Sequence, residues 1–191
     1  MTNKRLVVGI SGASAPIFGV RTLELMKQVE GVETHLVYSA AAVRTIELET
    51  QLTISAIQDL ADVVYEPVDI AASISSGSFR TMGMIIAPCS MSTLACIATS
   101  VSKDLLTRAA DVTLKERRPL VLLCRESPLH LGHLRRMAEA TEMGAVIAPP
   151  IPSFYHAPQS IDDLINHSIG RALDIFGLDL PWMKRWQSPS P

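Results

Sequence analysis

The sequence has few cysteines and no long apolar run. Its three cysteines are Cys89, Cys96 and Cys124, and none belongs to a CxxC pair. All three lie in apolar surroundings, so we expect buried thiols of a reducing compartment, with neither a disulfide nor a metal site. No apolar stretch approaches the ~18 residues that cross a membrane, and the N-terminus lacks a signal-peptide pattern. These absences predict a soluble, cytoplasmic protein.

Net charge is also small. The chain has 17 Lys and Arg against 19 Asp and Glu and contains no polybasic tract. A nucleic-acid-binding module would need a basic excess, so we expect no nucleic-acid partner. With 191 residues, of which 48% are apolar, the chain is long enough for a full core. We therefore predict a single domain over 1–191, with about 179–191 as a C-terminal tail and frayed ends at MTNK and SPSP.

Five apolar stretches predict buried strands. They cover residues 5–11, 33–39, 83–88, 119–124 and 145–148. Because these stretches are apolar on both faces, they favour a parallel sheet covered by helices. Helical patterns alternate with them, at 16–28, 40–49, 54–61, 91–98, 104–117, 129–142 and 161–176. This alternation predicts a doubly wound α/β fold with helices on both faces of the sheet.

Small and hydroxyl residues gather where three of these strands end. Residues 11–14 follow the first strand, Ser39 ends the second, and residues 89–93 follow the third. Helix capping explains each turn on its own. In doubly wound folds, however, ligands bind at the carboxyl ends of the strands, where helix N-termini offer free N–H groups. Three such turns together predict a site for a phosphorylated, planar cofactor.

The first of these turns, SGASAP, holds one glycine, Gly12, and a proline, Pro16. Proline disfavours helical geometry in the residue before it, so we expect Ala15 to be the N-cap and Pro16 the first helical residue. A positive φ at Ala15 would cost about 1–2 kcal/mol, so the prediction is a negative φ. Ser14 is then left free to point its hydroxyl into a pocket.

Basic residues recur along the helix predicted over 104–117. Arg108 and Lys115 are seven residues apart and share one face. Asp104 precedes Arg108 by four residues and Asp111 precedes Lys115 by four, the favourable orientation for surface ion pairs. The face is therefore either solvated and salt-bridged or part of a site.

Arg125 differs from these, because it directly follows a predicted strand at the ligand-binding edge. An arginine there favours anion binding.

Other candidates have simpler explanations. His130 and His133 suggest a helix start rather than a metal site, because further ligands are not evident. Asp162 and Asp163 resemble an acidic metal-binding pair, but Ser160 three residues before Asp163 favours a helix-capping box. The proline-rich loop around Tyr155 either holds the tyrosine hydroxyl over a pocket or covers the core.

Several motifs together resemble the UbiX-type flavin prenyltransferases. They are GISGAS, ETHLVYS, ASISSGSF, PCSMSTLA, LLTRAADVTLKERRPLVL with the following RESPL turn, and EMGAVIAPPIPSFYHAPQS. The resemblance covers about residues 5–186, and the TRAADV to RESPL segment is its most specific part. It implies a flavodoxin-like, Rossmann-like homo-oligomer, typically a dodecamer, with active sites at subunit interfaces.

The resemblance also implies a reaction. Such enzymes transfer a dimethylallyl group from dimethylallyl monophosphate to N5 of reduced FMN, and a second bond to C6 closes a ring. The prenylated FMN then serves a UbiD-type decarboxylase, including the one of ubiquinone synthesis. No metal is needed, so protein cations and hydroxyls must stabilise the departing phosphate.

Site residues follow from the same resemblance, position by position. The implied FMN-binding residues are Gly12, Ala13, Ser14, Ser39, Ser90, Met91, Ser92, Thr93 and Arg125. Those implied for dimethylallyl phosphate are Tyr155, Arg171, Lys115 and Arg108. Glu49 would handle proton transfer, and Ser14 and Lys115 would act with it in catalysis.

Three departures from the family pattern, and two rival hypotheses, remain. Ala15-Pro16 stands where Gly-Ala is usual, Ala40 where lysine is frequent, and Arg135-Arg136 where many members have Glu-Asn. One rival is a non-catalytic FMN-binding subunit of an aromatic-acid decarboxylase, which would not need Glu49 or the phosphate-binding residues. The other is a flavin-dependent cysteine decarboxylase, which needs a histidine on an early helix that the sequence lacks.

Overall fold

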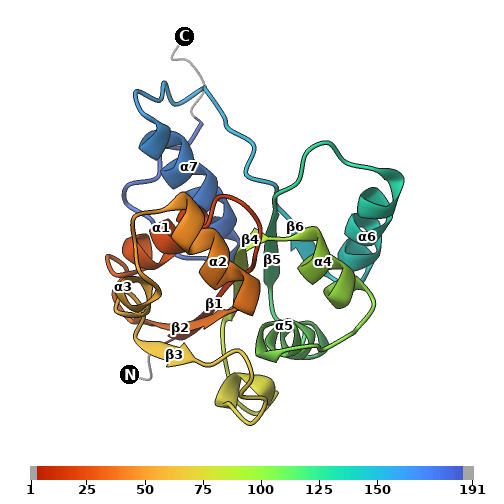
Figure 1. Cartoon of the computed structure of the whole chain (residues 1–191). Helices are drawn as coiled ribbons and strands as arrows, with labels where there is room; N and C mark the ends of the chain where they lie inside the picture. Colours follow the sequence, from red (N-terminus) through yellow and green to blue (C-terminus); the bar gives the residue numbers. More distant parts are fainter. Residues whose placement is uncertain (1–3, 187–191) are drawn as a thin grey trace.

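Six parallel strands form one sheet in the computed structural model, which describes residues 4–186 (Figure 1). The strands are β1 (Lys4–Ile10), β2 (Val32–Tyr38), β3 (Val63–Tyr65), β4 (Gly83–Cys89), β5 (Leu120–Cys124) and β6 (Ala145–Ile147). The α-helices are α1 (Ile17–Met26), α2 (Ala40–Glu49), α3 (Ile54–Gln58), α4 (Met91–Ala98), α5 (Leu105–Lys115), α6 (Leu131–Glu142) and α7 (Ile161–Leu173). Two 3-10 turns, η1 (Ser73–Ser75) and η2 (Asp174–Phe176), complete the elements.

The strand order is β3-β2-β1-β4-β5-β6. Without the short edge strand β3, this is the order of flavodoxin-like folds, and with β3 it is the Rossmann order. The predicted doubly wound α/β fold is confirmed, although β3 was not expected from the sequence. The direction of winding reverses between β1 and β4, and ligands bind in the crevice at such a switch point.

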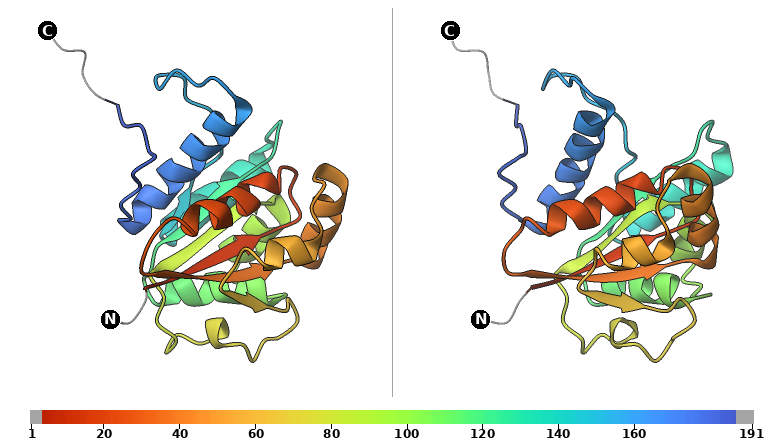
Figure 2. Two further views of the ribbon diagram at one scale, coloured as in Figure 1. Left: turned by 90° about the vertical axis from the view of Figure 1, so that its left-hand side faces the viewer. Right: turned by 60° about the vertical axis from the view of Figure 1, so that its left-hand side comes forward.

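Two layers of helices cover the sheet (Figure 2). Alternate strand residues, such as Leu6 and Val7 of β1, belong to opposite core clusters. One cluster packs β1, β2, β4 and β5 against α1, α2, α3 and α7, and the other packs the reverse face against α4, α5, α6 and η1. Every residue of β4 is buried, as expected for a central strand covered on both faces.

The structure resolves several details that the sequence left open. Ser160 accepts a hydrogen bond from the Asp163 amide, and the Asp163 carboxylate accepts one from the Ser160 amide, so the predicted capping box is confirmed. His130 caps α6, as expected of a helix start, by accepting a hydrogen bond from the Gly132 amide. Among the described residues, no three His, Cys, Asp or Glu side chains are grouped so that they could hold a metal ion.

The three cysteines are free thiols. Cys89 and Cys124 are buried register partners on β4 and β5, whereas Cys96 is only partly buried, contrary to expectation. The neighbouring Cys124 thiol and burial raise the pKa of Cys89 well above its usual value. Cys89 is therefore a protonated packing residue.

Near the C-terminus, Leu180 and Met183 are buried in the cluster that includes α7. These residues lie in the segment that the sequence assigned to a tail, while the expected fraying of MTNK and SPSP falls mostly outside the described residues. Lys4, the last residue of MTNK, begins β1. Over residues 4–186, none of the helices has both the length and the hydropathy to cross a membrane.

Candidate active site

The β1–α1 loop lies at the switch point and is tied to the end of β4. Ser11 is fully buried, and its hydroxyl donates to the Pro88 carbonyl (2.8 Å) and accepts from the Ser90 amide (2.7 Å). Gly12 packs so closely on α2 that an added Cβ would lie 2.4 Å from the Cβ of Ala41. The glycine is thus required by the contact between this loop and the start of α2.

Ala15 contradicts the sequence prediction. Its φ is +67°, in the left-handed region, and Pro16 rather than Ala15 is the N-cap of α1. In this conformation the Ala15 amide donates a 2.7 Å hydrogen bond to Oε2 of Glu49. The prediction weighed only the local cost of a positive φ, whereas the structure offsets that cost with a hydrogen bond to an anionic acceptor.

Ser14 is not free either, because its hydroxyl donates to the same Glu49 oxygen at 2.9 Å. Glu49 is the last residue of α2 and is exposed, as is its contact with Ser14. One carboxylate oxygen therefore joins the end of α2 to the loop before α1. Through this hydrogen bond a proton can pass between the Ser14 hydroxyl and the Glu49 carboxylate.

Two helices begin at this edge of the sheet with serine caps. The Ser39 hydroxyl accepts from the Ala42 amide at the start of α2, and the Ser90 hydroxyl accepts from the Thr93 amide at the start of α4, both at 3.2 Å. The capping interpretation is therefore correct for both serines. Capping by these serines is compatible with a ligand-binding site at the same place. The other N–H groups in the first turn of each helix still point outward from its N-terminus and can bind an anion.

The remaining residues expected at the flavin site lie around α4 and β5. Thr93 is buried, Met91 is partly buried, and Ser92 is exposed and accepts from the Lys103 ammonium at 3.1 Å. Arg125 is exposed directly after β5, and its amide donates to the Cys89 carbonyl (3.1 Å). Ala13 is buried in the first loop. The structure thus gathers all the FMN-site candidates at one edge of the sheet.

Tyr155 and Arg171 line a second hollow together. A cavity of about 200 Å³ lies between the loop that follows β6 and the helix α7, and Ser153, His167 and Ser168 also line it. Arg171 donates to Asp174 at 2.7 Å, and Arg185 donates to the same carboxylate through two bonds of 2.8 and 2.9 Å. The tyrosine is exposed and borders a pocket, which favours the first of the two alternatives left open by the sequence.

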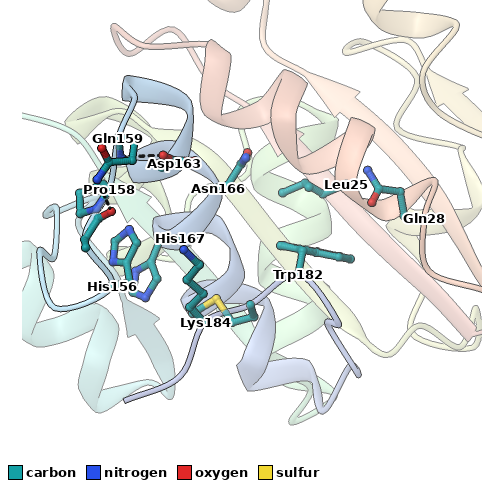
Figure 3. Close-up of a pocket in the computed structure, with 12 residues that line it drawn as sticks. Leu25, Gln28, His156, Pro158, Gln159, Asp163, Asn166, His167, Trp182 and Lys184 are labelled. Carbon is teal, nitrogen blue, oxygen red and sulfur yellow. Dashed lines mark hydrogen bonds between the residues drawn. The ribbon is translucent and has the colours of Figure 1, made fainter. Parts of the chain in front are cut away.

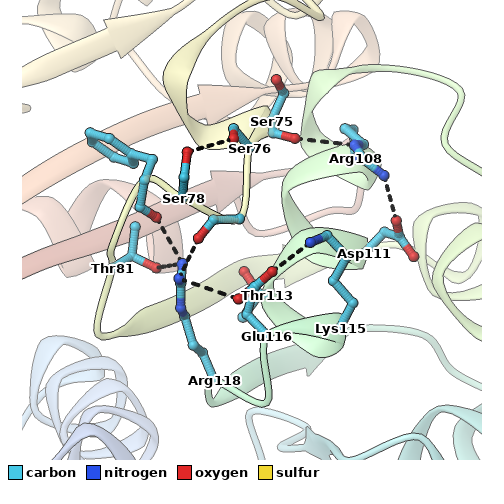
Figure 4. Close-up of polar contacts among 12 residues, drawn as sticks. Ser75, Ser76, Ser78, Thr81, Arg108, Asp111, Thr113, Lys115, Glu116 and Arg118 are labelled. Atoms are coloured by element: carbon cyan, nitrogen blue, oxygen red, sulfur yellow. Dashed lines mark hydrogen bonds and ion pairs between the residues drawn. The ribbon is translucent and has the colours of Figure 1, made fainter.

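Lys115 and Arg108 both lie on α5 (Figure 4). Lys115 ends α5 just before β5 begins, beside Gly77, at the amino edge of the sheet. Since β4 has seven residues at about 3.3 Å each, the two edges are about 20 Å apart. Within one chain, Lys115 and the loop of Gly12 are not brought together.

The ion pairs along α5 also differ from those expected. Asp104 caps the helix instead of pairing with Arg108. Asp111 pairs with Arg108 at 2.8 Å, and Lys115 pairs with the neighbouring Glu116 (Figure 4). Arg108 also donates to the Ser75 carbonyl at 3.3 Å, which ties α5 to η1. Because the capping box engages Asp104, Arg108 pairs with Asp111 at the i to i+3 spacing instead.

His167 is a residue that the sequence reasoning missed. It is 7% exposed on the inner side of α7, and its Nε2 lies 2.8 Å from the Tyr155 hydroxyl. Burial, followed by the neighbouring His156, lowers the pKa of His167 below its ordinary value. The available signal was its position four residues before Arg171, which places both on one helix face.

Comparison with known proteins gives consistent results. The Flavoprotein family matches residues 1–172. The flavin prenyltransferase UbiX of Escherichia coli (strain K12) is 60% identical over 186 residues, which cover 96% of this chain and 98% of that protein. UbiX of Thauera aromatica is 57% identical over 182 residues, covering 95% of this chain and 93% of that protein.

A solved structure described as AnUbiX (PadA1) in complex with FMN and dimethylallyl pyrophosphate superposes with a TM-score of 0.95. It is 49% identical and covers 98% of this chain and all of its own. A dodecameric FMN-dependent UbiX-like decarboxylase from Escherichia coli O157:H7 gives a TM-score of 0.93 at 48% identity, with 96% and 100% covered. The likeness therefore extends over the whole fold.

Proposed function

The chain belongs to the UbiX-type flavin prenyltransferases of the Flavoprotein family, and from this premise we propose that it makes prenylated FMN. The reaction transfers a dimethylallyl group from dimethylallyl monophosphate to N5 and C6 of reduced FMN. The observation that carries the proposal is the 60% identity to a flavin prenyltransferase over nearly the full length of both chains. FMN is the acceptor substrate, and the proposal requires no metal.

The donor groups at the carboxyl edge suit a flavin mononucleotide. The N-termini of α2 and α4 open there, capped by Ser39 and Ser90, and Arg125 adds a cation. Helix N-terminal N–H groups and an arginine are the ordinary partners of a phosphate or of ring carbonyl oxygens. Gly12, Ala13 and Ser14 would line the same crevice, and so would residues 91–93. When bound, reduced FMN supplies a nucleophilic N5 and then C6.

The prenyl phosphate needs cations and hydroxyls on the other side of the reaction centre. The pocket shared by Tyr155 and Arg171 supports a phosphate site, because it offers a hydroxyl donor and a guanidinium. Lys115 lies at the amino edge of the sheet, opposite the β1–α1 loop of its own chain. We propose that Lys115 and Arg108 enter the site from a second copy, in a homo-oligomer like the dodecameric relative.

Glu49 and Ser14 would transfer protons during the reaction. The Ser14 hydroxyl already donates to Oε2 of Glu49 at 2.9 Å, so the pair can hold a proton near the flavin and release it as the second bond forms. The Ala15 amide fixes the same oxygen at 2.7 Å, which keeps the carboxylate oriented toward the loop. The cations would stabilise the phosphate that departs.

The product would go to a UbiD-type decarboxylase, with the ubiquinone pathway as the expected setting. The three free cysteines fit the reducing cytoplasm, where we place the reaction.

The test is anaerobic incubation of the purified protein with reduced FMN and dimethylallyl monophosphate, followed by mass analysis of the extracted flavin. We expect a flavin that carries one added dimethylallyl unit. A parallel reaction with the diphosphate establishes the substrate preference, and oxidised FMN serves as the negative control. Flavin recovered unchanged under all conditions would favour the non-catalytic FMN-binding subunit instead.

A further inference from the structure

The Tyr155 hydroxyl is one end of a short hydrogen-bonded chain inside the protein. It lies 2.8 Å from Nε2 of His167, and the Ser153 hydroxyl lies 2.9 Å from Nδ1 of the same ring. Both ring nitrogens of His167 are therefore engaged. The ring of His156 stacks on that of His167, with centroids 4.1 Å apart and an interplanar angle of 4°, which restricts rotation of the imidazole.

His167 stands between two cavities. On one side is the pocket of about 200 Å³ that Tyr155 and Arg171 line. On the other is a pocket of about 360 Å³ between α1, α7 and the segment around Trp182 and Lys184 (Figure 3). His167 borders both cavities, and Figure 3 shows its ring beside that of His156. The orientation and tautomer of the His167 ring therefore determine whether the Tyr155 hydroxyl donates its proton to His167 or into the pocket that it lines with Arg171.

The protonation state of His167 limits the possible arrangements. Burial and, after it, the nearby His156 lower the pKa of His167. The ring is accordingly neutral near pH 7, with one donor and one acceptor nitrogen. A tyrosine hydroxyl has one proton, so a Tyr155 hydroxyl that donates to a phosphate can only accept from His167.

We propose that His167 is a positioning residue for the departing phosphate: it donates from Nε2 to the Tyr155 oxygen and so directs the tyrosine proton toward the phosphate. Ser153 fixes the required tautomer by donating its hydroxyl proton to Nδ1. The hydrogen bonds then run in one direction, from Ser153 through His167 and Tyr155 to the phosphate. The inference rests on the proposed function, because it takes Tyr155 as a phosphate contact.

The experiment compares His167→Phe with His167→Gln. Phenylalanine removes both hydrogen bonds, whereas the glutamine amide can still donate toward the Tyr155 oxygen. We expect kcat/KM for dimethylallyl monophosphate to fall about tenfold in His167→Phe, the usual effect of one lost hydrogen bond, and to recover in His167→Gln. KM for reduced FMN should stay unchanged in both. Ser153→Ala, which leaves the ring but removes the tautomer control, should fall between them.

A purely structural role is tested by a double-mutant cycle with Tyr155→Phe. If His167 acts through the tyrosine, adding His167→Phe to Tyr155→Phe should cause no further loss of kcat/KM. Equal kcat/KM for wild type and a folded His167→Phe, or additive losses in the cycle, would overturn the inference while leaving the prenyl transfer intact. A wild-type protein that forms no prenylated flavin would overturn the proposed function itself, and this inference with it.

Discussion

Replacing Ala15 with glycine should stabilise the protein. Ala15 has a φ of +67°, which costs an L-residue about 1–2 kcal/mol and costs glycine almost nothing. Glycine also has more conformational entropy than alanine in the unfolded chain. This lowers the stability of the variant by about 0.4–1 kcal/mol and offsets part of the gain. The hydrogen bond from the residue 15 amide to Glu49 uses only backbone atoms on the loop side, so it is retained. The net expectation is a gain of about 0.5–1 kcal/mol in the free energy of unfolding.

Urea unfolding and thermal unfolding measure this gain. For a chain of this size, 1 kcal/mol shifts Tm by about 2–4 °C, so Ala15→Gly should raise Tm by about 1–4 °C with an unchanged m-value. The matched control is Ala13→Gly in the same loop. Ala13 is buried and is not among the residues with positive φ, so its replacement should lower stability. A loss of stability in Ala15→Gly equal to that in Ala13→Gly would refute the left-handed conformation.

Three further predictions follow from contacts at and near the site. Gly12→Ala should cost about 1–3 kcal/mol of stability and weaken FMN binding measured by fluorescence, because its Cβ would lie 2.4 Å from Ala41; equal stability and affinity would contradict the close contact. Glu49→Gln should lower turnover at least about 100-fold with Tm unchanged, because the amide oxygen can accept both loop hydrogen bonds; unaltered turnover would exclude proton transfer by Glu49. Burial lowers the pKa of His35 despite its Glu33 neighbour, so the unfolded chain binds the extra proton first. The free energy of unfolding should therefore fall as pH drops below 6.5, by at most about 1.4 kcal/mol per pH unit from this group, and His35→Gln should lose that slope in urea titrations.

The fold was largely readable from the sequence. The central strands β1, β2, β4 and β5 are apolar on both faces, and helices α2 and α4 begin and end where the pattern placed them. The short strand β3 was missed because its three residues form a strand only by pairing with the edge of β2. Such pairing depends on a neighbour that lies far along the chain, and no local pattern marks it.

Local rules failed where a distant side chain supplied the deciding interaction. The φ of Ala15 follows from a carboxylate 34 residues away, and the engagement of Ser14 follows from the same group. His167 was overlooked for a similar reason, since its partners Ser153 and Tyr155 lie in an irregular loop. Propensity arguments count the cost of an unusual conformation and omit the tertiary contact that offsets it.

The sequence by itself determined the family, the parallel sheet and the set of polar residues at its carboxyl edge, because hydrophobic periodicity and motif spacing are local properties of the chain. Only the tertiary structure decided how those residues are used. It joined Glu49 to Ser14 and Ala15, coupled His167 to Tyr155, and placed Lys115 at the edge of the sheet opposite the β1–α1 loop. Hydrogen bonds and distances between remote segments arise only once the sheet and its covering helices have packed together.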